Sequence, residues 1–282
     1  MSKLLNVSSS PHVRCGVSTK NLMYDVAIAM LPATIWGVMQ FGIYSLIVVV
    51  ATVLSCVLSE YLFETLMHKP VTISDGSALV TGMILGLNMP PAIPLWMPIL
   101  GGVFAIIVVK QLYGGLGQNW MNPALAARCF MLISFAQAMT QFSEPGTDAI
   151  ASATPLAEIK AGGTYDLAAM FIGKIPGTIG EVSVIALLIG AAYLLAKKVI
   201  TIRIPAAYLI SFAVFVFIFG QHNLTYVLAH LCGGGLIFGA FFMATDYSTS
   251  PMTKNGRILF GICLGVLTAI FRTFGNTAEG VS

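Results

Sequence analysis

The sequence predicts an all-α protein that crosses a membrane many times within a single domain, residues 1–282. Three observations predict this: 57% of the 282 residues are hydrophobic, only 9% are charged, and the mean hydropathy is +0.89. A soluble domain carries about 25% charged residues. The composition therefore excludes an ordinary soluble fold, and the small net charge of +3 gives no reason to expect a nucleic-acid partner.

Nine apolar runs lie between charges and Pro/Gly breaks, and about 20 apolar residues are needed to cross the hydrocarbon core as a helix. The runs cover residues 22–41, 43–63, 77–89, 95–113, 123–142, 179–197, 204–220, 224–244 and 258–274. The run 77–89 is too short to span alone and is bracketed by Asp75-Gly76 and Pro90-Pro91. It is predicted to be a half-helix or re-entrant segment, which protein or water must shield.

Two halves of the chain look related, about 21–142 and about 179–282, with a long loop at about 143–178 between them. The matched positions are Gly82, Gly102, Lys110 and Gly114 in the first half and Gly239, Gly261, Arg272 and Gly275 in the second. Five segments per half predict two inverted repeats with short broken helices, as in many transport proteins. Ten segments are then expected, and the last would follow residue 282. The alternative is that Gly-rich membrane helices resemble one another by composition.

The basic residues predict the orientation, because lysine and arginine favour the cytoplasmic side. With the N-terminus inside and a crossing at every run, 11 of the 14 basic residues, Lys110 and Arg128 among them, fall inside. Lys160, Lys174 and Arg272 fall outside. This predicts a multi-pass protein of the cell (inner) membrane with a cytoplasmic N-terminus and the 143–178 loop on the outer face. Residues 1–20 lack the apolar core of a signal peptide.

The five cysteines lie far apart without a C-x-x-C pair, so neither a disulfide nor a metal site is predicted. Three consecutive glycines, 233–235, lie inside the run 224–244. Such residues permit close helix packing or a helix break, and packing is the favoured interpretation.

Several carboxylates lie in or at the ends of the runs, where an unpaired charge costs at least a few kcal/mol. Asp75, Asp246, Asp25 and Glu60 are therefore candidates for an ion pathway, and Glu64 and Glu279 share their setting. Asp75 and Asp246 are the strongest because each adjoins a small-residue break in a corresponding part of its half. The alternative is a place in the headgroup region, or pairing with Lys69, Lys254 or Arg257.

A small polar loop, Asp148-Ala-Ile-Ala-Ser-Ala-Thr154-Pro, lies in the outer segment. Ser152 and Ala153 would let the active site of a second protein approach the Thr154 hydroxyl, as a modification acceptor requires. The alternative is that Thr154 caps a short helix that begins at Pro155. Both can hold, because a phosphate beside a helix N-terminus meets free N–H groups.

This loop resembles the acceptor motif of flavin transferases, Asp-x-x-Ser/Thr-Gly-Ala-Thr, in which FMN phosphate is esterified to the last threonine. Ala151 and Ser152 stand where the motif has Ser-Gly. Residues 9–12, 74–82, 113–124, 154–157 and 245–251 resemble the same family, the D subunit of the Rnf complex and the B subunit of the sodium-pumping NADH:quinone reductase. The latter has a longer N-terminus, so the Rnf protein is the better match.

The resemblance implies an electron-carrying membrane subunit of a ferredoxin:NAD oxidoreductase coupled to Na⁺ or H⁺ export. It implies covalent FMN on Thr154, with Asp148, Ser152 and Ala153 completing the acceptor, and it allows a second, non-covalent riboflavin. The chain has no nucleotide fingerprint and no iron–sulfur cysteine set, so it is not a complete enzyme alone, and no catalytic residue is assigned. The implied partners are the ferredoxin-oxidising iron–sulfur subunit, the NAD-binding subunit, the flavin-bearing G subunit, the A and E membrane subunits, and a flavin transferase.

A glycine-rich loop between the fourth and fifth runs offers flexible backbone and amide groups that could wrap a flavin edge or ribityl chain. Its candidate residues are Gly114, Gly115, Gln118, Asn119 and Asn122. It is not a dinucleotide fingerprint, because no strand–helix unit surrounds it. A tight turn between helices is the alternative.

A different class of function stays open on the sequence alone. A channel or secondary transporter for a small solute would use the same inverted halves without redox chemistry. A purely structural subunit would leave the acceptor loop unexplained. The sequence does not choose between Na⁺ and H⁺, since carboxylates and carbonyls serve both.

Overall fold

The computed structural model describes residues 18–143, 150–151, 156, 159, 166–220 and 222–275. Within these ranges the regular structure is helical, apart from a two-residue ribbon in which β1 (Phe142–Ser143) pairs antiparallel with β2 (Ile150–Ala151). The predicted all-α class is confirmed at this level.

The first half contains five main helices. They are α1 (Thr19–Phe41), α2 (Ile43–Leu66), α3 (Ser77–Leu87), α4 (Trp96–Phe104) and α5 (Pro123–Ser134). A 3₁₀ turn, η1 (Ile73–Asp75), precedes α3, the π-helix η2 (Ala105–Gln111) continues α4, and the short α6 (Ala136–Met139) follows α5. Local chemistry fixes the start of α5, because Asn122 Oδ1 accepts two backbone N–H groups and Pro123 fills the first helical position, where no donor is needed.

The second half also combines long and short helices. It contains α8 (Leu167–Ile172), α9 (Val184–Ala196), α10 (Arg203–Phe219), α11 (Leu224–Cys232), α12 (Leu236–Phe238), the π-helix η3 (Gly239–Met243) and α13 (Lys254–Phe274). Polar side chains cap four of them: Asp166, Ser183, Asn223 and Thr253 each accept a backbone N–H from the first turn that follows.

Among the described residues, three single helices are long and apolar enough to cross a membrane, namely α1, α2 and α13, and α11 with α12–η3 qualifies as a bent pair. Shorter apolar helices are α3, α4–η2, α5, α9 and α10. Each of the nine predicted runs thus contains an apolar helix, and the number of spans stays a prediction. Large apolar side chains such as Ile35, Ile210 and Leu259 are exposed on α1, α10 and α13, as lipid-facing helices require.

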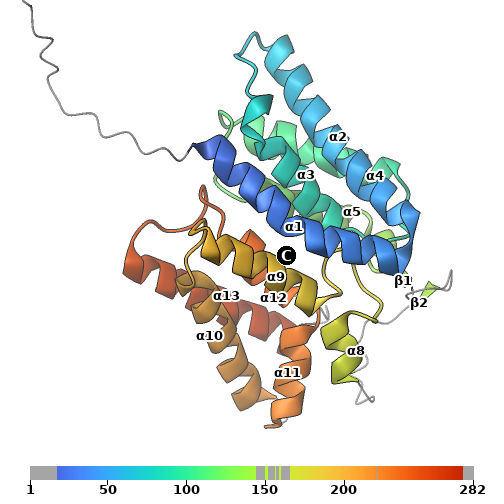
Figure 1. The fold of residues 1–282 in the computed structure, drawn as a ribbon, viewed down its shortest axis with the longest axis vertical. Coiled ribbons are helices and arrows are strands. Elements are labelled where there is room, and N and C mark those ends of the chain that lie inside the picture. The colour runs from blue at the N-terminus through green and yellow to red at the C-terminus, as the bar shows by residue number, and fades with distance from the viewer. Residues whose placement is uncertain are drawn as a thin grey trace, which may run out of the picture.

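Helices α1 and α9 lie side by side and join the two halves, with α2–α5 on one side of them and α10–α13 on the other (Figure 1). Small residues bring the two backbones close. A Cβ at Gly190 of α9 would collide with the Ala29 carbonyl of α1, and one at Gly37 of α1 would collide with the Ile179 carbonyl. Glycines are used in this way wherever membrane helices approach closely.

The glycines at 233–235 break the helix of the run 224–244, so the structure adds a helix break to the close packing that was the favoured interpretation. Gly234 and Gly235 have φ of 61° and 66°, a left-handed conformation that glycine adopts without strain. Helix α11 ends before them and α12 begins after them, and the two arms of the pair are bent by 65°. The second half therefore contains a broken helix in its interior.

Three basic residues that the charge count assigned to one or the other side of the membrane are buried in the helical bundle. Lys110, Arg128 and Arg272 expose 2%, 2% and 0% of their surface. Each has oxygen partners inside the protein, so none of them reports which side of the membrane it faces. The predicted orientation then rests on the remaining basic residues, nine inside and two outside.

Candidate functional site

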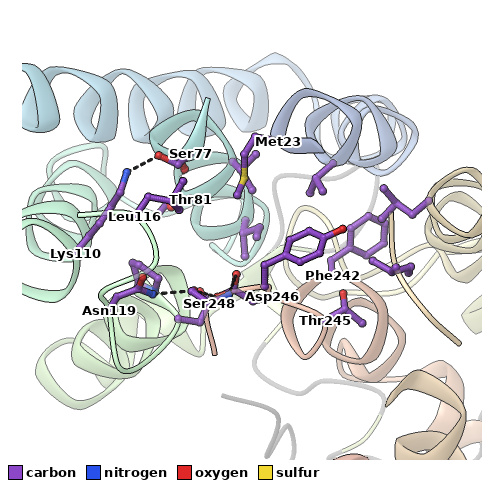
Figure 2. Close-up of a pocket in the computed structure, with 18 of the residues that line it drawn as sticks. Met23, Ser77, Thr81, Lys110, Leu116, Asn119, Phe242, Thr245, Asp246 and Ser248 are labelled. Atoms are coloured by element: carbon purple, nitrogen blue, oxygen red, sulfur yellow. Dashed lines mark hydrogen bonds between the residues drawn. The ribbon is translucent and has the colours of Figure 1, made fainter. Parts of the chain in front are cut away.

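A pocket that is partly open to solvent lies between the two halves (Figure 2). Its walls come from α1, α3, the loop after η2, the end of α9, η3 and the turn after η3. The polar lining residues are Ser77, Thr81, Lys110, Asn119, Asn122, Thr245, Asp246, Tyr247 and Ser248, and the rest are mainly apolar. A largely apolar cavity with a few polar groups has the make-up of a small-molecule site.

Three loops meet at this pocket, and the sequence predicts that all three are cytoplasmic. Leu116 follows η2, Ile200 follows α9 and Tyr247 follows η3, and all three residues line the cavity. The Tyr247 hydroxyl donates to the Val199 carbonyl, and burial raises the pKa of Tyr247. The two π-helices also contribute, since Lys110 lies in η2 and Phe242 in η3; such irregular turns are frequent at functional sites.

The glycine-rich loop forms one wall through its two asparagines. Asn119 and Asn122 line the pocket, whereas Gly114, Gly115 and Gln118 do not. Gly114 and Gly115 have φ of 119° and 97°, and the Gly115 N–H donates to the Lys110 carbonyl. The glycines therefore shape the turn that presents Asn119.

Asn119 has an unused acceptor. Its Nδ2 donates to the Met121 carbonyl at 2.8 Å and to Ser248 Oγ at 3.1 Å. Its Oδ1 is buried and has no hydrogen-bond partner among the described residues. A buried acceptor without a partner costs about 1–3 kcal/mol, so a donor from a ligand or a water molecule at this wall would be stabilising. Asn122 differs, because its Oδ1 is already engaged as the cap of α5.

Asp246 lies at the pocket, and its carboxylate is held by its own turn. It accepts hydrogen bonds from Ser248 Oγ at 2.9 Å and from Thr249 Oγ1 at 3.2 Å. Because Ser248 Oγ also accepts from Asn119, a continuous chain of polar contacts joins the two halves across the pocket (Figure 2). Arg257 donates instead to the Pro251 carbonyl and to Thr201.

Glu60 belongs to a buried charged cluster behind the pocket wall. Lys110 Nζ lies 2.6 Å from Glu60 Oε1 and 2.5 Å from Ser77 Oγ. Gln111 Nε2 donates to Glu60 at 2.8 Å and to Glu64 at 3.2 Å. Lys110 and Ser77 line the pocket, so the cluster reaches the cavity only through them.

Asp75 joins the same cluster at the start of α3. Its Oδ1 accepts from the Ser77 N–H at 2.8 Å and from Ser77 Oγ at 2.7 Å. A carboxylate beside the first turn of a helix is stabilised by the free N–H groups there. Asp75 thus contacts the pocket indirectly, through Ser77.

Asp25 lies elsewhere, on the seam between α1 and α9. Tyr193 Oη donates to Asp25 Oδ1 at 2.8 Å, and Lys197 Nζ lies 3.7 Å from the same oxygen. Asp25 is partly exposed and does not line the pocket. Of the four carboxylates predicted for an ion pathway, the structure brings Asp246 to the cavity itself, Asp75 and Glu60 to a cluster beside it, and Asp25 to neither.

A second buried cluster was not predicted from the sequence. Arg128 of α5 donates to Asn88 Oδ1 at 2.5 Å and to Glu181 Oε1 at 2.8 Å, with all three side chains buried. Arg272 of α13 lies nearby, and donates to the carbonyls of His230 and Gly234 at 2.6 and 2.7 Å. The signal that could have found the cluster is an arginine within the apolar sequence 123–134, which only a buried acceptor could satisfy.

The acceptor residues Asp148, Ser152, Ala153 and Thr154 lie outside the described residues, so their roles stay predictions. Two residues just after them are described. Leu156 and Ile159 are 2% exposed and pack with Met170 of α8 and Ala229 of α11. A Cβ at Gly234 would collide with Leu156. Leu156 therefore lies against the break between α11 and α12.

Sequence comparison identifies the family of this chain. Residues 6–282 match the NQR2, RnfD, RnfE family. The chain belongs to this family. The predicted resemblance to this family is thereby confirmed.

Three relatives within the family cover almost the whole chain. The D subunit of the Na⁺-translocating ferredoxin:NAD⁺ oxidoreductase complex of Acetobacterium woodii is 45% identical, over 99% of this chain and 88% of that protein. The D subunit of the proton-translocating ferredoxin:NAD⁺ oxidoreductase complex of Clostridium ljungdahlii is 40% identical, over 99% and 89%. The D subunit of the ion-translocating oxidoreductase complex of Methanosarcina acetivorans is 34% identical, over 97% and 88%.

Proposed function

We propose that this chain is the D-type membrane subunit of an Rnf-type, ion-translocating ferredoxin:NAD⁺ oxidoreductase, and that it carries flavin. The observation that carries the proposal is the 45% identity to a protein of this name across 99% of the chain. The partners are the other subunits of such a complex: those that oxidise ferredoxin and bind NAD, the flavin-bearing G subunit, and the A and E membrane subunits. A flavin transferase loads the cofactor.

The first flavin is FMN, linked through its phosphate to Thr154. The acceptor motif supports this assignment, and so does the anchoring of Leu156 two residues later. A flavin bound there would accept electrons and pass them on. The described part of the chain supports this proposal with two buried residues close after Thr154, because Leu156 and Ile159 pack against α8 and α11.

The second flavin is a non-covalent riboflavin in the pocket between the halves. The unpartnered Asn119 Oδ1 offers an acceptor for a ring N–H, and the Ser77 and Thr81 hydroxyls suit a polyhydroxyl chain. The apolar walls, which include Ile84 and Phe242, would exclude water from a flat ring system. This flavin would lie near the cytoplasmic face and the FMN at the outer face.

The halves are proposed to be inverted repeats around the short helices. In each half a buried cation near the end of a later helix contacts the start of a short helix. Lys110 in η2 contacts Ser77 at the start of α3, and Arg272 in α13 contacts Gly234 just before α12. Such broken helices form ion sites in transport proteins. Asp246 at the pocket is the strongest ion-pathway candidate, and Asp75 and Glu60 are secondary ones.

The energies are compatible with coupled transport. Moving one cation against roughly 150 mV costs about 3.5 kcal/mol. A two-electron potential drop of roughly 75 mV supplies as much, at about 1.4 kcal/mol per 30 mV. A modest potential step between two flavins is therefore sufficient to drive one ion.

Flavin attachment is tested on the chain co-expressed with a flavin transferase, by in-gel flavin fluorescence and intact mass. We expect a fluorescent band with one FMN-sized adduct in the wild-type protein and none in Thr154→Ala. Thr140→Ala removes the hydroxyl of an exposed threonine outside the motif and serves as the matched control, which should remain labelled. A wild-type chain without an adduct would remove the covalent flavin and favour a colourless solute channel or transporter.

Ion coupling is tested on the complete complex reconstituted in liposomes. Addition of reduced ferredoxin and NAD⁺ should drive ion uptake that stops when either substrate is omitted. Uptake that proceeds without electron transfer would contradict the proposed function.

A further inference from the structure

The polar contact that crosses the pocket has a fixed donor and a fixed acceptor at each step. Asn119 Nδ2 lies 2.8 Å from the Met121 carbonyl, which can only accept, so the amide nitrogen must be on that side. Ser248 Oγ lies 2.9 Å from Asp246 Oδ2, and an ionised carboxylate also only accepts, so the hydroxyl proton points to Asp246. Ser248 Oγ is therefore free to accept the second Nδ2 proton of Asn119, at 3.1 Å.

This hydrogen bond joins the two halves of the chain at the pocket. Asn119 lies between η2 and α5, and Ser248 lies in the turn after η3, 129 residues further along. Among the described residues, it is the one side-chain hydrogen bond between the halves whose two partners both line the cavity (Figure 2). The contacts between the halves at Arg128 and at Asp25 lie away from the pocket lining.

The two ends of the chain of contacts offer different chemistry. At one end, Asn119 Oδ1 is buried without a partner among the described residues, and it is the acceptor proposed for a flavin ring N–H. At the other end, Asp246 is the carboxylate proposed to meet the transported cation. One amide and one hydroxyl therefore separate the group that would contact the flavin from the group that would contact the ion.

Such a chain transmits a change of charge from one end to the other. Hydrogen bonds in series polarise one another, and they do so more strongly away from water. Asn119 is only 6% exposed, and Ser248 and Asp246 are half-buried. Reduction adds negative charge to a flavin ring and makes its N–H a poorer donor to Asn119. Ser248 then donates less strongly to Asp246, and the carboxylate attracts a cation more strongly.

The same coupling must act in the opposite direction. Coupling between two sites is reciprocal, so a cation bound at Asp246 has to favour the reduced flavin by the factor by which reduction favours the cation. A cation at Asp246 should therefore raise the midpoint potential of the flavin in the pocket. Direct attraction between the two charges adds to this effect, but it does not pass through Ser248.

We infer that Ser248 couples reduction of the pocket flavin to cation binding at Asp246, by linking that carboxylate to Asn119. The inference rests on the proposed function, both for the flavin in the pocket and for ion translocation. Ser248 is a positioning residue in this role, because it acts through Asn119 and Asp246.

The test replaces Ser248 in the complete complex, reconstituted in liposomes with reduced ferredoxin and NAD⁺. Ser248→Ala removes the hydroxyl, while the backbone N–H of residue 248 can still donate to Asp246 Oδ1 and hold the turn. We expect ion uptake divided by NAD⁺ reduction to fall at least threefold. Ser248→Thr keeps a hydroxyl and should restore the ratio.

A second readout follows the flavin itself. The bound, extractable flavin is titrated redox-potentiometrically at low and at high concentration of the ion that the wild-type complex takes up. The ion should raise the midpoint potential in the wild type, and the shift should fall to less than half in Ser248→Ala. A shift of wild-type size in Ser248→Ala would overturn the inference.

Two neighbouring residues supply the matched controls. Thr249→Val removes the other hydroxyl that donates to Asp246 Oδ2, but Thr249 has no contact with Asn119, so this variant should lose clearly less coupling than Ser248→Ala. Ser250→Ala makes the same change at a residue outside the pocket lining and should match the wild type. Equal losses in Ser248→Ala and Thr249→Val would show that only the shape of the Asp246 turn matters, which overturns the inference.

If Ser248→Ala does not assemble, Ser248→Cys decides. A thiol has nearly the same shape as the hydroxyl but is a weak donor and a weak acceptor. Ser248→Cys should therefore lower both the uptake ratio and the ion-dependent potential shift. Wild-type values for both in this variant would overturn the inference.

The proposed function is judged separately, on the wild-type complex in the same liposomes. A wild type without extractable flavin, or without electron-driven ion uptake, removes the proposed function. A wild type that holds the flavin and takes up ions, beside a Ser248→Ala complex that behaves as Ser250→Ala does, removes only the role of Ser248.

Discussion

Lys110 Nζ lies 2.6 Å from Glu60 Oε1, at a place where the two side chains expose 2% and 0% of their surface. The pair links η2 to α2 and is held further by Ser77 and Gln111. Each charge compensates the other where water cannot, so neither residue can be changed alone without leaving a charge buried.

Replacing one residue of this pair should destabilise the protein more, per residue replaced, than replacing both. Lys110→Met and Glu60→Gln each leave one partner without its counter-charge, which typically costs about 3–5 kcal/mol. The double variant Lys110→Met/Glu60→Gln removes both charges and should be less destabilised than the sum of the single variants. The measurement is the apparent melting temperature of the detergent-purified complex at one fixed heating rate. Strict additivity of the two losses would mean that the pair is not coupled.

Most of the helices could be predicted from the sequence, because a membrane helix is encoded by a continuous run of apolar residues. All nine predicted runs contain helices, and the half-helix at α3 begins at Ser77 as expected. The break at Gly233–Gly235 could not be decided, because the same glycines permit close packing or a left-handed turn. The choice depends on neighbours distant in sequence, namely Glu181 and Leu156.

The residues of the candidate site were predictable only where they lie in a polar turn that stands out in the local sequence. Asn119 and Asp246 were found because small polar turns stand out between apolar runs. Arg128 was counted only as a basic residue on the inner side, because nothing within the sequence 123–134 reveals that Asn88 and Glu181 converge on it. Residues that are functional only through distant partners require the three-dimensional structure.

Asn119 should hold the non-covalent flavin through its free acceptor. Asn119→Ala removes the buried Oδ1 and should weaken flavin retention by about three- to tenfold, the effect of one neutral hydrogen bond. Asn21→Ala is the matched control, since Asn21 is exposed on α1 and does not line the pocket. The measurement is flavin released on denaturation per complex after washing. Equal retention in the two variants would exclude Asn119 as a ligand.

Gly235 should tolerate no side chain, because an added Cβ would both strain the backbone and collide with Glu181. Both Gly235 and Gly117 have positive φ, 66° and 83°, so alanine costs about 1–3 kcal/mol of backbone strain at either. Only at Gly235 would the new Cβ also collide with the Glu181 carboxylate, whereas Gly117 has open space. Overpacking adds about 1–3 kcal/mol, so Gly235→Ala should lower the apparent melting temperature well below that of Gly117→Ala. Equal melting temperatures would show that Glu181 moves aside freely.

Replacing Asp246 should impair ion transport, whereas replacing Asp25, which forms a partly exposed ion pair, should not. Asp246→Asn keeps the shape of the turn with Ser248 and removes the charge at the pocket, so ion uptake per electron by the reconstituted complex should fall about tenfold or more. Asp25 is partly exposed beside Lys197, and such exposed pairs contribute about 0–1 kcal/mol. Asp25→Asn should therefore pump as the wild type does. The readout is electron-driven ion uptake divided by NAD⁺ reduction in the same vesicles, which cancels differences in the amount of active complex. Uptake that stays fully coupled in Asp246→Asn would exclude this carboxylate from the pathway and leave the cluster of Asp75 and Glu60 as the next place to search.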